Sequence, residues 1–254
     1  MQGKSLYLSK AKLIEKKEIR LSEKIVVVSS ALKKYFSERY KIDAKKIIVT
    51  PNAINAENVK MDEDEIRNLK AKYNLNENFV IGFVGSIFPY HGVDILIKSF
   101  RTVIDKHRNC KLLIVGDGEI LPFLKIVSEK LKLGNSVIFT GNIAHPYIFN
   151  HIELMNICVM PTSNWYGSPV KIFEYGILGK AIVAPDNIPL RDVMENNKHG
   201  ILIQPDETNL TEAILKLMEN ESLRITLGKN FQQKVLSEHT WEKMAQKILS
   251  SIDK

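Results

Sequence analysis

The chain has 254 residues, of which 44% are hydrophobic and 26% are charged, and its formal net charge at pH 7 is +7. This length accommodates one large domain, or one domain with part of another, and the hydrophobic fraction can fill a sizeable core. The sequence has no run of about 18 apolar residues and no secretory leader at its beginning, so we expect neither a membrane span nor export. Cys110 and Cys158 fall in or beside predicted strands without a CxxC motif, so we expect reduced core residues.

The positive charge is concentrated at the beginning of the chain. Residues 1–50 hold thirteen Lys or Arg and five Asp or Glu, a net charge of +8, so the remaining residues sum to −1. A nucleic-acid-binding protein usually interleaves basic residues with exposed aromatics or sets them along a recognition helix, and this segment does neither. Nucleic acid is therefore not an expected partner. Two interpretations stay open: a solvated helix face, or peripheral contact with an anionic membrane or a lipid-phosphate acceptor.

Short apolar runs alternate with amphipathic segments along most of the chain. The runs, rich in Val, Ile and Phe, predict strands at residues 24–30, 46–50, 79–85, 111–116, 136–141, 157–161, 181–185 and 200–205. The amphipathic segments predict helices at residues 93–107, 120–133, 146–155, 169–179, 188–197 and 208–220, followed by two closing helices in 221–254. Strands that are apolar on both faces and separated by helices predict an α/β fold with a doubly wound, Rossmann-like parallel sheet.

Residues 50–78 interrupt this alternation with Pro, Asn and a charged helix, a pattern typical of an interdomain linker. The segment before it has room for two strands and about two helices, which is too little for a self-sufficient domain. We therefore divide the chain into a partial second domain (1–56), a linker with a charged helix (57–78), a Rossmann-like domain (79–235) and a C-terminal helix (236–254) that has Trp241 as an apolar anchor.

Unusual residues cluster in the loops after four predicted strands. In an open parallel sheet, ligands bind beyond the carboxyl ends of the strands. The loops there read GSIFPYHG, GDGE, GNIAHP and PTSNWYGSP. Three of the four open on glycine, which lets the backbone approach a ligand closely. We expect all four loops to line one cleft.

The segment YGSPVKIFEYG combines a helix start with a carboxylate. Ser168 is expected to cap the helix and Pro169 to occupy its first position, so that the free amides of Val170 and Lys171 point toward an anion such as phosphate. Glu174 lies about a turn and a half further along, where a carboxylate can accept both hydroxyls of a vicinal diol such as a ribose. The alternative is that Ser-Pro only caps a structural helix, and that Glu174 is a surface residue or pairs with a lysine.

These motifs occur together, in the same order and spacing, in a known family. Residues 23 to about 245, which include IGFVGSIFPYHG, LLIVGDGE, VIFTGNIAHPYIF and YGSPVKIFEYGILGKAIVAP, resemble the donor-binding half of the GT-B glycosyltransferases of family four. Those enzymes transfer sugars with retention from nucleotide-diphosphate sugars. The resemblance implies that Glu174, at the second glutamate of the family's Glu-x7-Glu signature, binds the ribose. It also implies that the other nucleotide-sugar contacts are the amides around Gly167, Ser168, Val170 and Lys171 for the diphosphate, and the loops at Gly116 and at Gly141, Asn142 and Ile143 for the base.

The chain departs from the family pattern in three places. Tyr166 stands where the first glutamate of the signature belongs, so recognition of the donor sugar must differ or be lost. After Gly85, Ser86 and His91 replace the Arg and Lys that usually neutralise the diphosphate, which leaves hydrogen bonding and at most a titratable charge unless Lys171 compensates. The family's catalytic histidine lies in the first domain, of which this chain is expected to retain only the last part, so no catalytic residue is assigned. The C-terminal helix normally crosses back to that domain.

The expected function is hexosyl transfer with retention from a nucleotide-diphosphate sugar, without cofactor or metal, in polysaccharide or glycoconjugate biosynthesis. This chain would supply the donor-binding half in the cytoplasm or peripherally at a membrane, and a separate chain is a candidate source of the first GT-B domain. A non-catalytic nucleotide-binding or interaction subunit is the alternative, favoured by Tyr166 and Ser86. A nucleotide-sugar epimerase of the same architecture is a third interpretation. A Rossmann dehydrogenase is disfavoured, because Gly116 and Gly118 of VGDGEI are followed by Leu121 at the position where the third glycine belongs.

Overall fold

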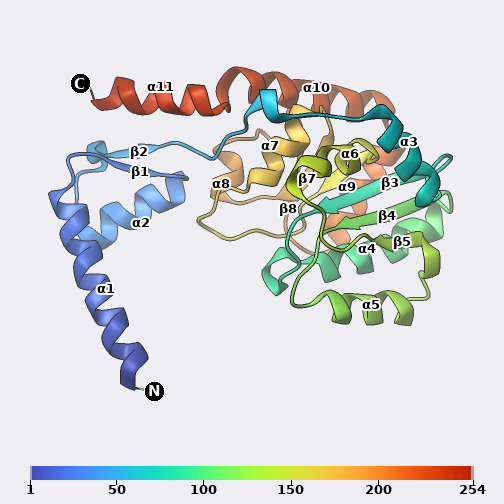
Figure 1. The fold of residues 1–254 in the computed structure, drawn as a ribbon, viewed down its shortest axis with the longest axis horizontal. Helices are drawn as coiled ribbons and strands as arrows, with labels where there is room; N and C mark the ends of the chain where they lie inside the picture. The colour runs from blue at the N-terminus through green and yellow to red at the C-terminus, as the bar shows by residue number, and fades with distance from the viewer. Residues whose placement is uncertain (1, 253–254) are drawn as a thin grey trace.

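The computed structural model describes the backbone of residues 2–252 and the side chains of residues 10–252, and its strands form two separate parallel sheets (Figure 1). The smaller sheet pairs β1 (Ile25–Val27) with β2 (Ile47–Val49), in a register that sets Ile25 opposite Ile47. It is accompanied by α1 (Gln2–Leu21) and α2 (Ser30–Tyr40), and α1 extends away from the rest of the molecule. The two predicted strands and two helices of this region are therefore present.

The larger sheet has six parallel strands in the order β5-β4-β3-β6-β7-β8. Their bounds are β3 (Phe79–Val84), β4 (Cys110–Val115), β5 (Val137–Phe139), β6 (Ile157–Val159), β7 (Ala181–Pro185) and β8 (Ile201–Ile203). The chain runs outward from β3 to β5 and then returns to place β6 on the other side of β3. The predicted doubly wound parallel sheet is confirmed, and its switch point, where ligands bind in such folds, lies between β3 and β6.

The predicted helices are present, although several are shorter than expected. The structure contains α3 (Glu63–Lys72), α4 (Val93–Lys106), α5 (Leu121–Lys130), α6 (Ile148–Glu153), α7 (Val170–Ile177), α8 (Ile188–Arg191), α9 (Glu207–Glu219), α10 (Glu221–Glu238) and α11 (Trp241–Ile252). The prediction of a helix over 188–197 was wrong beyond Arg191: the chain turns at residues 192–193, Asn196 forms a bridge with Gly200, and Asn197 adopts a left-handed conformation with φ of 58°. The boundary predicted at 235/236 falls inside α10, which continues to Glu238.

Alternate residues of each strand enter two apolar layers, one on each face of the larger sheet. Ile81 and Phe83 belong to a cluster that includes residues of α4, α5 and α9. Val80 and Val84 belong to a second cluster, with residues of α3, α6, α7 and α10. The period of two along each strand produces this division, and burial on both faces explains the continuous apolar runs in the sequence. Cys110 and Cys158 are free and buried, as expected.

Two contacts fix α7, the helix that begins at the switch point. Its Tyr175 is fully buried, and the tyrosine hydroxyl accepts the backbone N–H of Val84 at 2.8 Å. Its Gly176 faces Phe231 of α10, where a Cβ on the glycine would lie only 2.7 Å from a ring carbon. The end of β3 and the body of α10 therefore both hold α7 in place.

The small sheet is joined to the large one by hydrogen bonds from residues far apart in sequence. The hydroxyl and backbone N–H of Ser30 both donate to the carboxylate of Asp192, at 2.6 and 2.7 Å. The Ser29 hydroxyl donates to the carbonyl of Tyr166 at 2.7 Å. Near the other end of the chain, Ile54 forms a β-bridge with Thr240.

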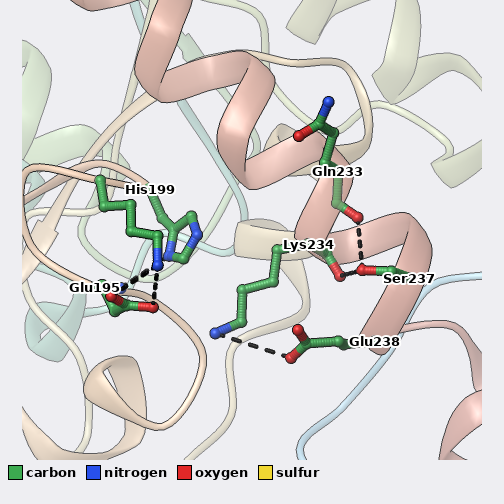
Figure 2. Close-up of polar contacts among 7 residues, drawn as sticks. Glu195, His199, Gln233, Lys234, Ser237 and Glu238 are labelled. Carbon is green, nitrogen blue, oxygen red and sulfur yellow. Dashed lines mark hydrogen bonds and ion pairs between the residues drawn. The ribbon is translucent and has the colours of Figure 1, made fainter.

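The turn between α8 and β8 lies beside α10, with charged side chains around His199 (Figure 2). The backbone N–H of Glu195 donates to Nδ1 of His199 at 3.1 Å, and the carboxylate of Glu195 pairs with Lys198 at 3.0 Å. On α10, Lys234 lies 3.9 Å from Glu238. Burial lowers the pKa of His199, and the charge of Lys234 acts in the same direction. None of these residues lines the cleft described below.

No helix within residues 2–252 is both long enough and apolar enough to cross a bilayer.

Candidate functional site

A cavity of about 500 Å3 opens at the carboxyl ends of β3 and β4, beside the start of α7. Its lining comes from the last residues of β3 and β4, the loops that follow β3, β4 and β5, and the start of α7: Val84, Gly85, Ser86, Tyr90, His91, Val115, Gly116, Asp117, Asn142, Ile143, His145, Ile148, Pro169, Val170, Lys171 and Glu174. A second cavity of about 180 Å3 shares Tyr90, His91, Pro169 and Lys171 with it and extends to Met160, Thr162, Ser163, Asn164, Gly167 and Ser168. The four loops singled out in the sequence thus border one cleft.

Most of the predicted site residues line this cleft. The larger cavity takes in Gly85, Ser86, His91, Gly116, Asn142, Ile143, Val170, Lys171 and Glu174, and the smaller takes in Gly167 and Ser168. Gly141 lines neither. Its carbonyl instead accepts the backbone N–H of Gly116 at 3.0 Å, so Gly141 joins the loops after β4 and β5.

Two glycines bring the backbone into the floor of the cleft. Gly85 and Gly116 have φ of 139° and 137°, conformations that residues with a side chain rarely adopt. A Cβ at Gly116 would lie 2.0 Å from the carbonyl oxygen of Gly85, and a Cβ at Gly85 would lie 2.5 Å from Nζ of Lys171. Glycine at these two positions therefore lets the loops after β3 and β4 pack closely together and leaves space for the Lys171 ammonium.

The amino group of Lys171 is buried and has no hydrogen-bond partner among the described residues. It lies 4.1 Å from the centre of the Phe83 ring, a cation–π distance. Burial lowers the pKa of Lys171 to about 8, while the negative charge of Glu174 acts in the opposite direction. A buried ammonium without an anionic partner is energetically unfavourable, so this group marks a place for an anion.

His91 contributes a neutral ring rather than a second charge. Burial, and next the positive charge of Lys171, lower the pKa of His91 to about 4. Its Nδ1 atom is buried without a partner among the described residues, and the ring lies 4.4 Å from that of Tyr90. At neutral pH the side chain is therefore uncharged and can exchange a hydrogen bond with a ligand.

The start of α7 differs from the prediction. Ser168 does not cap the helix: α7 begins at Val170, and Pro169 stands before its first residue with no side-chain cap. The Ser168 hydroxyl instead accepts the backbone N–H of Asn52 at 2.9 Å, and the Ser168 carbonyl accepts from the Asn52 side chain at 2.5 Å. The first amides of α7, at Val170 and Lys171, have no partner within the helix, because the residues that would accept from them precede it.

Glu174 is only 6% exposed, so its interpretation as a surface residue was wrong. Its partner is a histidine and not a lysine: Nε2 of His145 lies 2.9 Å from Glu174 Oε1. His145 was not among the predicted site residues, although it lies in the loop GNIAHP that was expected to reach the cleft. Tyr90, Asp117 and Asn164 were missed in the same way, since each lies in a quoted loop.

Comparisons with known proteins identify the family of this chain. Residues 65–234 match the family model described as glycosyl transferases group 1. The capsular polysaccharide biosynthesis glycosyltransferase CapM of Staphylococcus aureus is 30% identical over 245 residues, which cover 91% of this chain and 63% of that protein. The lipopolysaccharide 1,2-N-acetylglucosaminetransferase of Salmonella typhimurium is 25% identical over 89% of this chain and 60% of that protein. The chain thus spans less than two thirds of the length of these curated relatives.

Solved structures share the fold at lower identity. Anabaena Alr3699/HepE, whose crystal structure is a complex with UDP, superimposes with a TM-score of 0.83 at 20% identity, over 93% of this chain and 65% of that one. The C-terminal domain of a group 1 family glycosyl transferase, LpcC of Francisella tularensis, superimposes with a TM-score of 0.65 at 17% identity, over 74% of this chain and 99% of that one. These likenesses support the GT-B type of α/β fold.

Proposed function

Because the chain belongs to the group 1 glycosyl transferases, we propose that it is the donor-binding part of a glycosyltransferase that uses a nucleotide-diphosphate sugar. The finer proposal is a retaining GT-B enzyme of family four, acting in polysaccharide or glycoconjugate biosynthesis. A first GT-B domain, in the same or a separate polypeptide, would supply the acceptor site and the catalytic histidine.

The observation that carries this proposal is the ammonium of Lys171 in the cleft at the switch point, which has no hydrogen-bond partner within residues 10–252. The ammonium lies against Gly85, at the end of β3, while the backbone amides of Val170 and Lys171 open the helix that follows. A fixed cation and free amides at a helix N-terminus together favour a phosphate group. We therefore place the diphosphate between the end of β3 and the start of α7.

The nucleoside extends from the diphosphate along the larger cavity. Glu174 would accept the ribose hydroxyls, and the loop at Asn142 and Ile143 would face the base. The UDP complex of the Anabaena protein makes UDP the first nucleotide to test.

The donor sugar is assigned to the smaller cavity. The carboxylate usual in the family is missing, because Tyr166 occupies its position and lines neither cavity. Neutral polar side chains are available there instead, on Thr162, Ser163 and Asn164. We propose that hydroxyl and amide groups replace the usual carboxylate in binding the sugar.

The chemistry that this site supports is departure of the nucleoside diphosphate from the sugar. Negative charge grows on the diphosphate as the glycosidic bond breaks, and the ammonium of Lys171 with the first amides of α7 lie where that charge develops. Preorganised donors of this kind stabilise a transition state because they need no reorganisation during the reaction. In this proposal no metal ion or cofactor takes part.

Calorimetric titration with UDP tests the proposal, beside GDP and ADP. Glu174→Gln keeps the size of the side chain but removes its charge, and hydrogen bonds to charged groups contribute roughly 1.5–3 kcal/mol each. We expect UDP affinity to fall about tenfold or more, while the melting temperature without ligand changes little. A variant that melts earlier without ligand and binds UDP nearly as well as wild type would show that Glu174 is structural.

Two controls accompany this titration. Glu219→Gln changes another glutamate that pairs with a histidine, His107 at 3.3 Å, outside the cleft, and should leave UDP affinity unchanged. The 2′,3′-dideoxy nucleotide should bind wild type and Glu174→Gln equally weakly, since it lacks the diol.

A non-catalytic nucleotide-binding subunit is the second candidate, favoured by Tyr166 and Ser86 at positions where the family has charged residues. Both candidates predict UDP binding. They differ in catalytic turnover. Only the glycosyltransferase proposal predicts that the chain transfers sugar when a first GT-B domain is supplied. It also predicts that Lys171→Met abolishes this transfer.

A further inference from the structure

His145 holds the proposed ribose-binding carboxylate from a different part of the fold. It opens the short helix His145–Tyr147 after β5, while Glu174 belongs to α7. The imidazole Nε2 lies 2.9 Å from Glu174 Oε1, and the ring meets Phe149 of α6 edge to face at 5.9 Å. The imidazole is mostly exposed, whereas Glu174 and Phe149 are buried. An exposed histidine side chain thus contacts a buried carboxylate.

The chemistry of the pair fixes the direction of the hydrogen bond. An ionised carboxylate can only accept, so Nε2 carries the proton and donates it. A carboxylate offers about four lone-pair positions, and this bond uses one of them. The hydroxyls of a vicinal diol need two, so His145 and a ribose can bind Glu174 at the same time.

The position of Glu174 relative to Lys171 shows why the Glu174 carboxylate needs a hydrogen bond that keeps it in place. The two residues are three apart on α7, the spacing at which opposite charges on a helix pair readily. No ion pair joins them, although the structure describes both side chains. Glu174 is turned to His145, and Lys171 to the ring of Phe83. If they paired with each other, they would neutralise the two groups proposed to bind the ribose and the diphosphate.

We infer that His145 is a positioning residue, whose Nε2–H holds the Glu174 carboxylate away from Lys171 and presents its remaining lone pairs to the ribose of a nucleoside diphosphate. Through the same bond, the loop assigned to the base is fixed to the residue assigned to the ribose. This inference rests on the proposed function of the cleft.

Calorimetric titration of the full chain with UDP, 2′-deoxy-UDP and 3′-deoxy-UDP tests it. Wild type should prefer UDP. His145→Ala should weaken UDP binding by about 3- to 10-fold, the range expected for one net hydrogen bond. It should weaken binding of the deoxy nucleotides less, so that the preference for UDP shrinks. His145→Gln, whose amide nitrogen reaches about as far as Nε2, should restore most of the preference.

The matched control is His107→Ala, which removes another histidine paired with a glutamate, Glu219, outside the cleft. It should leave all three affinities unchanged. Melting without ligand should be nearly the same for wild type and His145→Ala, because the His145 side chain is 69% exposed. A crystal structure of ligand-free His145→Ala should show Glu174 paired with Lys171.

Other results would overturn the inference. Tighter UDP binding by His145→Ala would mean that the histidine competes with the ribose. A wild-type preference for UDP that His145→Ala leaves intact would refute the role of His145 and spare the ribose assignment. Equal binding of all three nucleotides by wild type would refute the ribose assignment itself, and this inference with it.

Discussion

Burial lowers the pKa of Lys171 to about 8, so its amino group titrates just above neutral pH. An ammonium is charged below its pKa and neutral above it. As the pH rises through 8, a growing fraction of the ligand-free chain therefore carries a neutral amine at the proposed diphosphate site. Binding of an anion restores the proton, so the bound state has the higher pKa.

We predict that UDP affinity falls as pH rises from 7 to 9.5, approaching tenfold per pH unit above 8 until the pKa of the bound state is reached. The phosphates of the nucleotide are ionised over nearly all of this range, the uracil base begins to lose its proton only at the upper end, and His91, with its pKa of about 4, does not titrate there. Calorimetric titration at half-unit steps measures the profile. An affinity that stays level over this range in wild type would contradict the assignment of Lys171.

Two variants separate Lys171 from other titrating groups. Lys171→Arg keeps the positive charge at every pH tested and should flatten the profile. Lys171→Met, which is uncharged and similar in length, should bind UDP weakly at all pH values, also with a flat profile. If Lys171→Met keeps the wild-type slope, another group causes it.

At the scale of elements, the position of α7 depends on its close packing with α10. Gly228 of α10 is buried against the turn after α7, where a Cβ would lie 2.0 Å from the carbonyl oxygen of Gly179. That neighbour is backbone and cannot move aside as a flexible side chain can. The two elements approach each other this closely because residue 228 has no side chain.

Gly228→Ala should therefore lower the free energy of unfolding by about 1–3 kcal/mol, the usual cost of overpacking. The better helix propensity of Ala offsets part of the steric cost, by about 0.5–1 kcal/mol. Urea denaturation followed by circular dichroism measures the net effect. Gly167→Ala is the control, because the nearest atom to its Cβ would be 4.0 Å away, and its stability should change by less than about 0.5 kcal/mol. A Gly228→Ala chain as stable as wild type would show that α7 and α10 are free to separate.

The sequence was informative about elements and less so about their ends. The strands of the large sheet could be predicted because burial on both faces leaves a continuous apolar run, such as that of β7. The cap of α7 could not, because a local rule assigns the Ser168 hydroxyl to the helix, whereas Asn52 binds it from another part of the chain. The bond between His145 and Glu174 escaped prediction for the same reason, since no local pattern relates the two residues.

At the scale of the whole molecule, positive charge is concentrated in one part of the chain, and one helix of that part protrudes. The excess positive charge lies in residues 1–50, and α1 extends away from the large sheet (Figure 1). On this helix, Leu13, Ile14 and Leu21 are 68%, 58% and 74% exposed, close to several lysines. Exposed apolar residues beside basic ones are typical of helices that lie on anionic membrane surfaces. We propose that α1 makes such a contact.

The chain should therefore sediment with vesicles that contain phosphatidylglycerol, and increasing salt should release it, because each basic residue near an anionic surface contributes about 1 kcal/mol that salt screens. Lys16→Glu with Lys17→Glu should abolish the binding at low salt. Lys125→Glu with Lys130→Glu on α5 changes the net charge equally and should retain it. Equal binding to phosphatidylcholine vesicles, or none at low salt, would show that the basic face is only solvated.

The bridge between Ile54 and Thr240 also bears on the order in which the chain folds. It joins positions separated by most of the sequence, and contacts of that kind close large loops and form late. Asn52, which holds Ser168 at the start of α7, lies two residues before Ile54. Although Asn52 leaves the ribosome early, we expect it to reach Ser168 only after α10 and Thr240 have been synthesised. A growing chain would therefore complete its large sheet first and acquire its full affinity for nucleotide last.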